Sequence, residues 1–399
     1  MNYFHAADFL LPKDCEMEKW AVIACDQYTS QPEYWDHVKQ FVADAPSTLQ
    51  MFFPEADLLE ITREDYERFI QNMENYLNNH FFAEYPNSYI YVERSLVNGQ
   101  IRSGVIGVVD LEYYDYDPKP DTKIFATEAT VLQRVPPRVA LRRNASLEFS
   151  HTVVFCDDPQ CRIIESVTNI RDQLPVLYDF DLMCDGGHIT GYLLTGDHAR
   201  NFEQLIAEYE ADNSYLVGDG NHSLVTAKLS YEAQKDTQLN VDWSNHPARY
   251  GMIELENIHS PAMLFEPIYR ILVCPDPQAF LTAFLQEDHP DGAPVTWIRG
   301  ENSGLVHLAL NEGELIIEAL QRVLDQWTAS NPASVDYIHG ADTVRELAHN
   351  ENTIGFLVPD IEKSILFPYV LSGKVMPKKT FSIGHATEKR YYLEGRRIK

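Results

Sequence analysis

The segment Ser214–Lys228, SYLVGDGNHSLVTAK, contains the pattern that decides the fold. Its first residues, Tyr215–Val217, are apolar and typical of a strand, and the residues from about His222 onward have helical spacing. Gly218 and Gly220 lie between them, and glycine permits the tight turn and close backbone approach that such a junction requires. The segment therefore predicts a strand, a glycine turn and a helix, as in a layered α/β or α+β fold.

The N-terminus of this predicted helix is suited to bind an anion. Asn221 or Ser223 is able to cap the helix, while unpaired backbone N–H groups and the positive dipole end favour a phosphate or carboxylate. Asp219 would face the same pocket as a metal ligand, a base or an acceptor for a ligand hydroxyl group. His222 would donate to an anion or transfer a proton. A capped turn whose polar side chains only satisfy backbone groups is the alternative interpretation.

The chain on either side of this segment repeats the alternation of strands and helices. The stretches SYIYVERSLV and QIRSGVIGVVDL flank Asn98-Gly99, a dipeptide that accepts the positive φ angles of a tight hairpin turn. Apolar residues at helical spacing predict helices at 32–44 and 63–82. Further strands are expected at Thr152–Cys156, Val176–Met183 and Ile189–Leu194, and further helices at about 160–172, 199–211 and 222–235.

Length and composition predict two domains. The chain has 399 residues, of which 45% are apolar and 23% charged, as is ordinary for a globular protein with a substantial core. The polar stretch 233–248 is the best candidate boundary. We therefore predict an N-terminal α/β domain over 1–240, which carries the glycine turn, and a C-terminal α+β domain over 245–399 with a basic tail.

The net charge of −28 disfavours several classes of function. A chain this acidic repels phosphate backbones and anionic lipid, so a general nucleic-acid or membrane-surface role is disfavoured, whereas a small anionic ligand in a local basic pocket is compatible with it. The N-terminal residues lack the unbroken apolar stretch of a signal peptide, and no window approaches the ~20 apolar residues of a transmembrane helix. We expect a cytoplasmic protein; its oligomeric state stays open.

A second set of residues suited to phosphate lies in the segment 127–145, TEATVLQRVPPRVALRRNA. Arg134, Arg138 and Arg142 are concentrated here against an acidic background, and guanidinium groups neutralise phosphate. The Pro136-Pro137 pair predicts an interruption of any helix, so a shared helical face for these arginines does not follow from their spacing. A solvated basic segment that pairs with neighbouring acidic residues is the alternative.

Glu128 and the C-terminal tail supply further candidates. Glu128 is suited to act as a general base that accepts a hydroxyl proton, although an ordinary exposed glutamate fits the sequence equally well. In the tail, His385, Lys389 and Arg390 are expected near the start of a helix that follows Gly384, where they would form a second anion site. A docked terminal helix whose tyrosines pack on the body of the protein is the alternative.

Several segments together resemble a known family. The sequence GDGNHSLVTA is similar to the Asp-Gly-His-His-Arg signature of a widespread bacterial and archaeal family, domain of unknown function 1015. The segments ACDQY, FATEAT with RVPPR, YIHG and MPKKTFSIGHATEKRYYLEGRR resemble the same family and span nearly the whole chain. The signature is also similar to one in the ParB/sulfiredoxin-like fold, whose members include a free-serine kinase that uses ADP as phosphoryl donor and nucleotide-hydrolysing partition proteins.

This resemblance implies a ParB/sulfiredoxin-like element in a two-lobed fold, with a nucleotide or phosphate site at Asp219–Ser223. The chain departs from the signature twice, because Asn221 replaces the first His and Ser223 replaces the Arg. Loss of that arginine removes a bidentate phosphate clamp. Nucleotide binding then requires another arginine, for which those of the segment 127–145 are candidates.

These features favour a phosphoryl-transfer enzyme. The hypothesis is a kinase or a phosphatase-like enzyme for a small hydroxylated metabolite, with ATP or ADP at the turn and Asp219 holding Mg²⁺. Serine or phosphoserine as that metabolite is implied only by the resemblance to the ParB/sulfiredoxin-like fold. His222 would stabilise the transferring charge or donate a proton, and Glu128 would be the hydroxyl base. A non-catalytic protein that binds a metabolite or nucleotide is the alternative, and neither the substrate nor the direction of transfer follows from the sequence.

Overall fold

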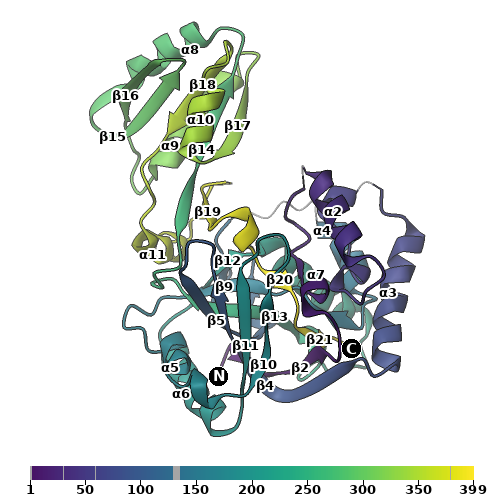
Figure 1. Cartoon of the computed structure of the whole chain (residues 1–399). Coiled ribbons are helices and arrows are strands. Elements are labelled where there is room, and N and C mark those ends of the chain that lie inside the picture. Colours follow the sequence, from purple (N-terminus) through teal and green to yellow (C-terminus); the bar gives the residue numbers. More distant parts are fainter. Residues whose placement is uncertain (1, 30, 59, 129–134, 378) are drawn as a thin grey trace. The chain divides into compact units, whose positions relative to one another are not determined.

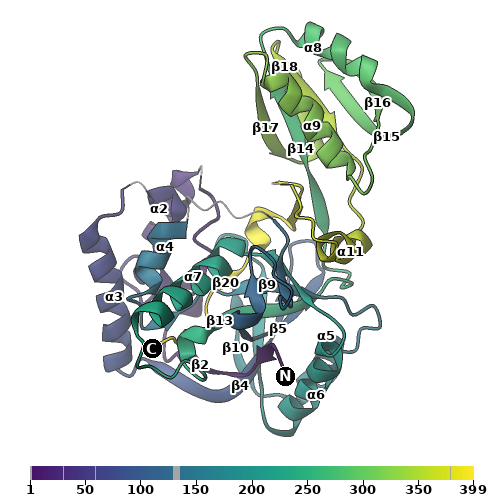
Figure 2. The ribbon, with the colours of Figure 1, turned by 180° about the vertical axis from the view of Figure 1, so that it is seen from behind.

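The structure, a computed structural model, describes residues 2–29, 31–58, 60–128, 135–377 and 379–399. The chain forms two compact units, and each is a mixed α/β structure, as the sequence predicts. The first unit consists of Met1–Met263 and His385–Lys399, and the second consists of Leu264–Gly384. Figures 1 and 2 show the elements of each unit from two sides.

A mixed sheet forms the centre of the first unit. Its strand β12 runs parallel to β7 and antiparallel to β9, so that two parallel strands end at the same edge of the sheet. The spatial order is β6 (Tyr114–Asp115), β7 (Ile124–Ala126), β12 (Tyr215–Asp219), β9 (Thr152–Cys156), β13 (Tyr250–Asn257), β5 (Ile101–Asp110), β4 (Phe82–Ser95), β2 (Ala7–Pro12), β21 (Gly395–Arg397) and β8 (Leu147–Glu148). Beside this path, β1 (Phe4–His5) pairs with β5, and β11 (His188–Leu194) pairs with β4 and with β10 (Val176–Asp181).

Apolar cores cover both faces of this sheet. Successive residues of a strand point to opposite faces, and in β4 Ile90 and Val92 are buried in one core while Tyr89 and Tyr91 are buried in the other. The first core also includes residues of α1 (Met17–Trp20), α2 (Pro32–Val42) and α3 (Arg63–Asn78). The second includes residues of α5 (Ile164–Thr168), α6 (Gly196–Glu210) and α7 (Asn221–Thr237).

The predicted hairpin is confirmed. Strands β4 and β5 pair antiparallel up to Ser95 and Ile101, and Gly99 in the turn between them has φ +80°. The strand predicted at Thr152–Cys156 coincides with β9. These elements were predictable because both their apolar pattern and their turn chemistry are local.

The second unit has a sheet of its own, in the order β16 (Asn302–Leu308), β15 (Asp288–Arg299), β18 (Thr353–Leu357), β14 (Phe265–Val273) and β17 (Ser334–His339). Apolar residues of α8 (Pro277–Phe284) and α9 (Ile316–Thr328) pack with Leu272, Ile354 and Phe356 on one face. On the other face, Val344 of α10 (Ala341–Leu347) lies over Gly355. The unit also contains α11 (Leu366–Leu371) and β19 (Phe381–Ile383), which pairs with β14.

The division of the chain differs from the predicted 1–240 and 245–399. Strand β13, which follows the polar stretch 233–248, pairs with both β5 and β9 inside the first sheet, so the boundary falls after Met263. The C-terminal tail returns to the first unit, where β21 pairs with β2 and β20 (Tyr391–Tyr392) pairs with β3 (Val22–Ile23). In the described part of the chain, no helix has the length and apolar character needed to cross a membrane.

Candidate functional site at the Asp219 turn

The predicted strand–turn–helix is present. Strand β12 ends at Asp219, Gly220 has φ +85° in the left-handed region, and α7 begins at Asn221. The Asp219 carboxylate accepts a hydrogen bond of 2.9 Å from the Gly220 N–H. Neither Asn221 nor Ser223 caps the helix, because the N-cap position is Gly220 itself, which has no side chain to do so. Glycine is required here because L-residues rarely adopt this φ.

Glu128 follows β7 at the same edge of the sheet as Asp219. In the parallel register Ala126 lies opposite Val217, and the hydroxyl of Thr127 donates to the Val217 carbonyl at 2.6 Å. Glu128 lies two residues beyond the end of β7, and Asp219 is the last residue of the parallel strand β12. The two carboxylates chosen from sequence therefore come from neighbouring strand ends, directly before α7.

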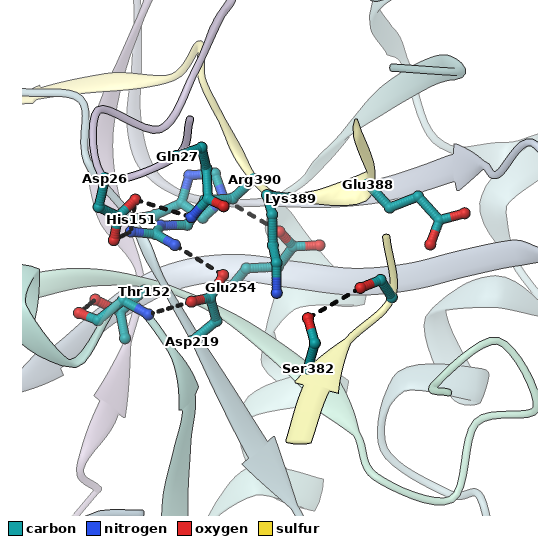
Figure 3. Close-up of polar contacts among 12 residues, drawn as sticks. Asp26, Gln27, His151, Thr152, Asp219, Glu254, Ser382, Glu388, Lys389 and Arg390 are labelled. Carbon is teal, nitrogen blue, oxygen red and sulfur yellow. Dashed lines mark hydrogen bonds and ion pairs between the residues drawn. The ribbon is translucent and has the colours of Figure 1, made fainter. Parts of the chain in front are cut away.

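Arg390 of the C-terminal tail lies at this turn. Its Nη1 donates to Asp219 at 2.8 Å and its Nη2 donates to Asp26 at 3.1 Å, as Figure 3 shows. The side chain is fully buried, and a Cβ atom on Gly220 would lie 3.0 Å from the guanidinium carbon. Arg390 thus belongs to the Asp219 turn rather than to a separate second anion site.

The other two residues of that predicted second site are less buried than Arg390. His385 is exposed and Lys389 is half-buried. The expected helix after Gly384 is only a short 3₁₀ turn, Ala386–Glu388, and the tail is held instead by Arg94, which donates to the carbonyls of Glu388 and Lys389. The tail therefore forms a docked segment inside the first unit.

Ion pairing keeps the groups around Arg390 charged. Burial opposes the ionisation of Asp26, but Arg390 and Arg138 hold the pKa of this carboxyl well below its usual range. Burial likewise disfavours the charged form of Arg390, yet Asp26 and Asp219 raise its pKa above the usual value. One guanidinium between two carboxylates is the central electrostatic feature of the site.

A second group of buried charges lies on β5, β9 and β13. His151 is 3.2 Å from a carboxylate oxygen of Glu254, and Arg102 forms an ion pair of 3.5 Å with Glu256. Burial, opposed by Arg102 and reinforced by Glu254, raises the pKa of Glu256 to about 8. The polar centre of the first unit therefore extends from the Asp219 turn across the neighbouring strands.

The arginines of the segment 127–145 are arranged differently from the prediction. Arg134 lies outside the described residues. Arg138 and Arg142 share a continuous helix, α4 (Val135–Arg142), because Pro136 and Pro137 occupy its first turn, where a missing N–H disrupts no intrahelical bond. The expected helix interruption was therefore wrong, and the two arginines are four residues apart, which places them on one face.

Both described arginines are already paired with carboxylates. Arg138 contacts Glu55 at 2.6 Å, and Arg142 forms a salt bridge with Glu148. They also line a pocket of about 100 Å³ together with Ser223. Arginine side chains and the first turn of α7 thus border the same pocket. The guanidinium groups of Arg138 and Arg142 are not free to bind phosphate alone, because each already pairs with a carboxylate.

The Asp219 carboxylate is engaged within the protein. Its two oxygens accept from the Gly220 N–H and from Arg390. Within the described ranges, no three His, Cys, Asp or Glu side chains are grouped so as to hold a metal. Mg²⁺ is usually held by one or two carboxylates together with substrate phosphates and water, so the role of Asp219 as an Mg²⁺ ligand stays a prediction.

Comparison with known proteins identifies the family. Residues 10–392 match the model of the protein family of unknown function DUF1015. The chain belongs to this family. The resemblance inferred from the sequence motifs is thereby confirmed, and no curated protein matches the chain.

Several solved structures are similar to this DUF1015 protein. A variant of free serine kinase in complex with ADP is 11% identical, with 72% of this chain and 90% of that chain covered and a TM-score of 0.39. SbnI from Staphylococcus aureus with a C-terminal truncation is 12% identical, with 70% and 83% covered and a TM-score of 0.36. A conserved hypothetical protein from Pyrococcus furiosus is 11% identical, with 73% and 94% covered and a TM-score of 0.35.

Sequence reasoning missed two partners in this DUF1015 site. Asp26 was not chosen, and Arg390 was assigned to another site, although ACDQY and the tail are both motifs of the family. Asp219 and Arg390 are 171 residues apart in the chain, so no local pattern joins them. The only sequence feature that pointed to Arg390 was its positive charge in the tail of an acidic chain.

Proposed function

We propose that the first unit binds the phosphate of a nucleotide or phosphorylated metabolite at Asp219–Ser223 and transfers a phosphoryl group to or from a small hydroxylated metabolite. The observation that carries this proposal is that the parallel strands β7 and β12 end at the same edge of the sheet, with Glu128 two residues after β7 and Asp219 directly before the N-terminus of α7. Phosphoryl transfer requires chiefly positioning and charge stabilisation, and a helix N-terminus supplies both N–H donors and a positive dipole end.

The described contacts support a division of roles. In the direction of phosphorylation, the acceptor hydroxyl oxygen forms a bond to the terminal phosphorus of ATP or ADP, the bond to the bridging oxygen breaks, and Glu128 takes the hydroxyl proton. Asn221 is a candidate for acceptor binding, because its side-chain oxygen is buried without a hydrogen-bond partner in the described residues, which is costly unless a donor reaches it. His222, in the first turn of α7, would stabilise the charge that develops on the phosphoryl oxygens.

Arg390 would orient the turn rather than clamp phosphate. Its two Nη atoms are engaged by Asp26 and Asp219, which fixes the Asp219 carboxylate next to the Gly220 backbone. Position 223 lacks the arginine of the family signature, but another arginine, Arg390, lies at the turn. Its role differs from that of a phosphate clamp. This arrangement explains how the turn keeps its geometry without the signature arginine.

The test is direct detection of transfer by ³¹P NMR. The protein is incubated with ATP or ADP and serine, and in the reverse direction with phosphoserine and AMP or ADP. We expect a phosphomonoester signal that depends on the protein and falls by about 10²-fold in Glu128→Gln, the loss typical of a general base. Glu208→Gln, which changes an exposed glutamate of α6, is the matched control.

A second candidate function is binding without turnover. The observation that favours it is that both oxygens of Asp219 already accept hydrogen bonds from within the protein, which gives this carboxylate a structural role in the turn. A ligand that raises the melting temperature by mass action, together with no transfer to any hydroxylated acceptor, would replace the enzyme by a sensor or scaffold.

A further inference from the structure

Two glycines make room for polar side chains on one face of the first sheet. Val92 of β4 lies opposite Gly104 of β5 and opposite Gly191 of β11. A Cβ atom on Gly104 would lie 2.7 Å from the side chain of Glu254, and a Cβ atom on Gly191 would overlap the ring of Tyr178. Both positions therefore require glycine, which in a strand marks the close approach of another group.

The side chains above these glycines surround a chamber of about 20 Å³ inside the first unit. Its polar lining consists of three arginines, two carboxyl groups and an imidazole, each between 1% and 7% exposed: Arg94, Arg102, Arg390, Glu254, Glu394 and His151. Figure 3 shows three of these residues, Arg390, Glu254 and His151. A protein cavity holds a water molecule once its volume reaches roughly 10–15 Å³. The chamber therefore has the size for one water molecule and is too small for an organic ligand.

One carboxylate oxygen at the chamber has no donor among the described residues. Glu254 Oε2 lies 3.2 Å from His151 Nε2, whereas Oε1, which lies over Gly104, accepts no hydrogen bond from them. Burial opposes the ionisation of Glu254, but His151 and Arg102 hold the pKa of this carboxyl below its usual value. The carboxylate thus stays charged, and a charged buried oxygen without a donor is costly.

A donor without an acceptor lies in the same lining. Nη1 of Arg102 donates to the carbonyl of Glu388 at 2.9 Å, and Nε lies 3.5 Å from Glu256. Nη2 makes no hydrogen bond within the described ranges, and no direct ion pair joins Arg102 to Glu254 there. Two groups of opposite charge that line one small space without direct contact are suited to a bridging water.

We propose that this chamber is the site of one buried water molecule, which donates to Glu254 Oε1 and accepts from Arg102 Nη2. The carboxyl of Glu394 provides its third hydrogen bond, the number typical of internal water. Glu394 belongs to the tail and follows Arg390 by four residues. The water thus joins β5 and β13 to the segment that brings Arg390 to Asp219, and it helps to position that segment. This site goes beyond the proposed phosphoryl transfer and does not depend on it.

The direct test is a high-resolution crystal structure of the natural protein, grown without ammonium salts. We expect one density peak in the chamber, with at least two of Glu254, Arg102 and Glu394 at about 2.7–3.2 Å from it. A chamber without density, or a peak with a single polar neighbour, would overturn the proposal. A peak that appears only in crystals grown with ammonium would overturn it too, because the occupant would then be a cation.

Val92→Thr tests the chamber in solution, because threonine has the shape of valine and Val92 lines the chamber. The new hydroxyl reaches the water, so we expect the equilibrium constant for unfolding to rise by less than about threefold. Val109→Thr is the matched control, since Val109 of β5 is fully buried in the second apolar core, where a hydroxyl has no such partner. Its unfolding constant is expected to rise by at least about tenfold. Equal losses in the two variants would contradict a water beside Val92.

The positioning role is tested by hydrogen exchange at Ala24, whose N–H donates to the carbonyl of Arg390 at 3.0 Å. The additional methyl group of Val92→Ile takes the place of the water. We expect faster exchange at Ala24 in this variant and unchanged exchange in Val109→Ile, which adds the same group to the apolar core. Exchange at Ala24 that stays unchanged in both variants would overturn the positioning role.

Discussion

The two units of the protein treat buried charge in opposite ways. The described residues of the second unit bury a single charged side chain, Arg270, whereas the first unit buries many, among them Arg102, Glu254, Glu256 and Arg390. Charges are costly to bury even when paired, and clusters of them with shifted pKa values are typical of functional sites. The contrast favours the first unit as the location of the proposed site.

The two units also differ in which groups neutralise their buried arginines. Arg390 is held by two carboxylates, those of Asp26 and Asp219. The hydrogen bonds described for Arg270 run to the backbone carbonyls of Ile268 and Lys379 and to the Gln321 side chain. A guanidinium bound by carbonyls fixes a loop, while a guanidinium between carboxylates also sets their charge and orientation.

Replacement of the two buried arginines is expected to give the largest effects and to separate these roles. Arg390→Met leaves Asp219 without its cation and Asp26 with only Arg138 nearby, and we expect the free energy of unfolding of the first unit to fall by about 3–5 kcal/mol. Arg270→Met leaves neutral acceptors unsatisfied, with an expected loss of about 1–3 kcal/mol in the second unit. Hydrogen exchange resolved by unit measures both losses. A loss for Arg270→Met that equals or exceeds the loss for Arg390→Met would contradict the proposed difference between the two buried arginines.

Asp219→Asn is expected to reduce phosphoryl transfer by at least about 10²-fold while the fold survives, because the shape and the bond from Gly220 are retained but the ion pair with Arg390 that positions the turn is lost. Arg390 keeps Asp26 as a partner in this variant, so its stability should stay closer to wild type than that of Arg390→Met. The ³¹P assay and thermal melting provide the measurements, with the exposed Asp212→Asn as control. If the variant keeps full turnover but melts at a lower temperature than the wild type, the role of Asp219 is structural.

Local patterns explain which parts of this architecture were predictable. The hairpin around Gly99, the strand Thr152–Cys156 and the helix after Gly220 follow from period and turn chemistry within a few residues. The helix over Val135–Arg142 was missed because proline was treated as a breaker, although in the first turn it is compatible with a helix.

Long-range pairing explains what was not predictable. No periodicity indicates that β13 enters the middle of the first sheet or that the tail pairs with β2 and β3. Only part of the site could therefore be predicted from the sequence. Asp219 and Glu128 were chosen from local chemistry, whereas the joining of Asp26 to Asp219 through Arg390 depends on a chain reversal that only the fold supplies.

Two glycines with positive φ sharpen the comparison within the first unit. Alanine at Gly99, φ +80° with no atom within 4 Å of the added Cβ, should cost about 1 kcal/mol through backbone strain alone. Alanine at Gly220, φ +85°, adds a Cβ contact of 3.0 Å with Arg390, so we expect about 2 kcal/mol from strain and the displaced guanidinium together. Denaturant unfolding of both variants is the measurement; equal losses would show that the guanidinium yields freely.

The smallest expected effect concerns a buried carboxyl group away from the site. Glu210 of α6 accepts hydrogen bonds from the N–H groups of Tyr3 and Phe4 at 2.6 and 2.9 Å and so holds β1 in place. Burial, only partly offset by these N–H donors, raises the pKa of Glu210 from 4.5 to about 7. Between these two values the folded protein retains a proton that the unfolded chain has lost. The free energy of unfolding therefore falls as the pH rises, by about 1 kcal/mol between pH 5 and 6.

Glu210→Gln tests this directly, because the amide does not titrate and still offers an oxygen to the two N–H groups. We expect the variant to lose about 1 kcal/mol less than wild type between pH 5 and 6 in the first unit. The second unit, whose described buried residues include no carboxyl group, serves as the internal control in the same exchange experiment. If both proteins follow the same pH profile, Glu210 is ionised in the fold. The two N–H donors would then lower the pKa of Glu210 more than its burial raises it. The first unit would in that case tolerate a buried negative charge also where no arginine pairs with it.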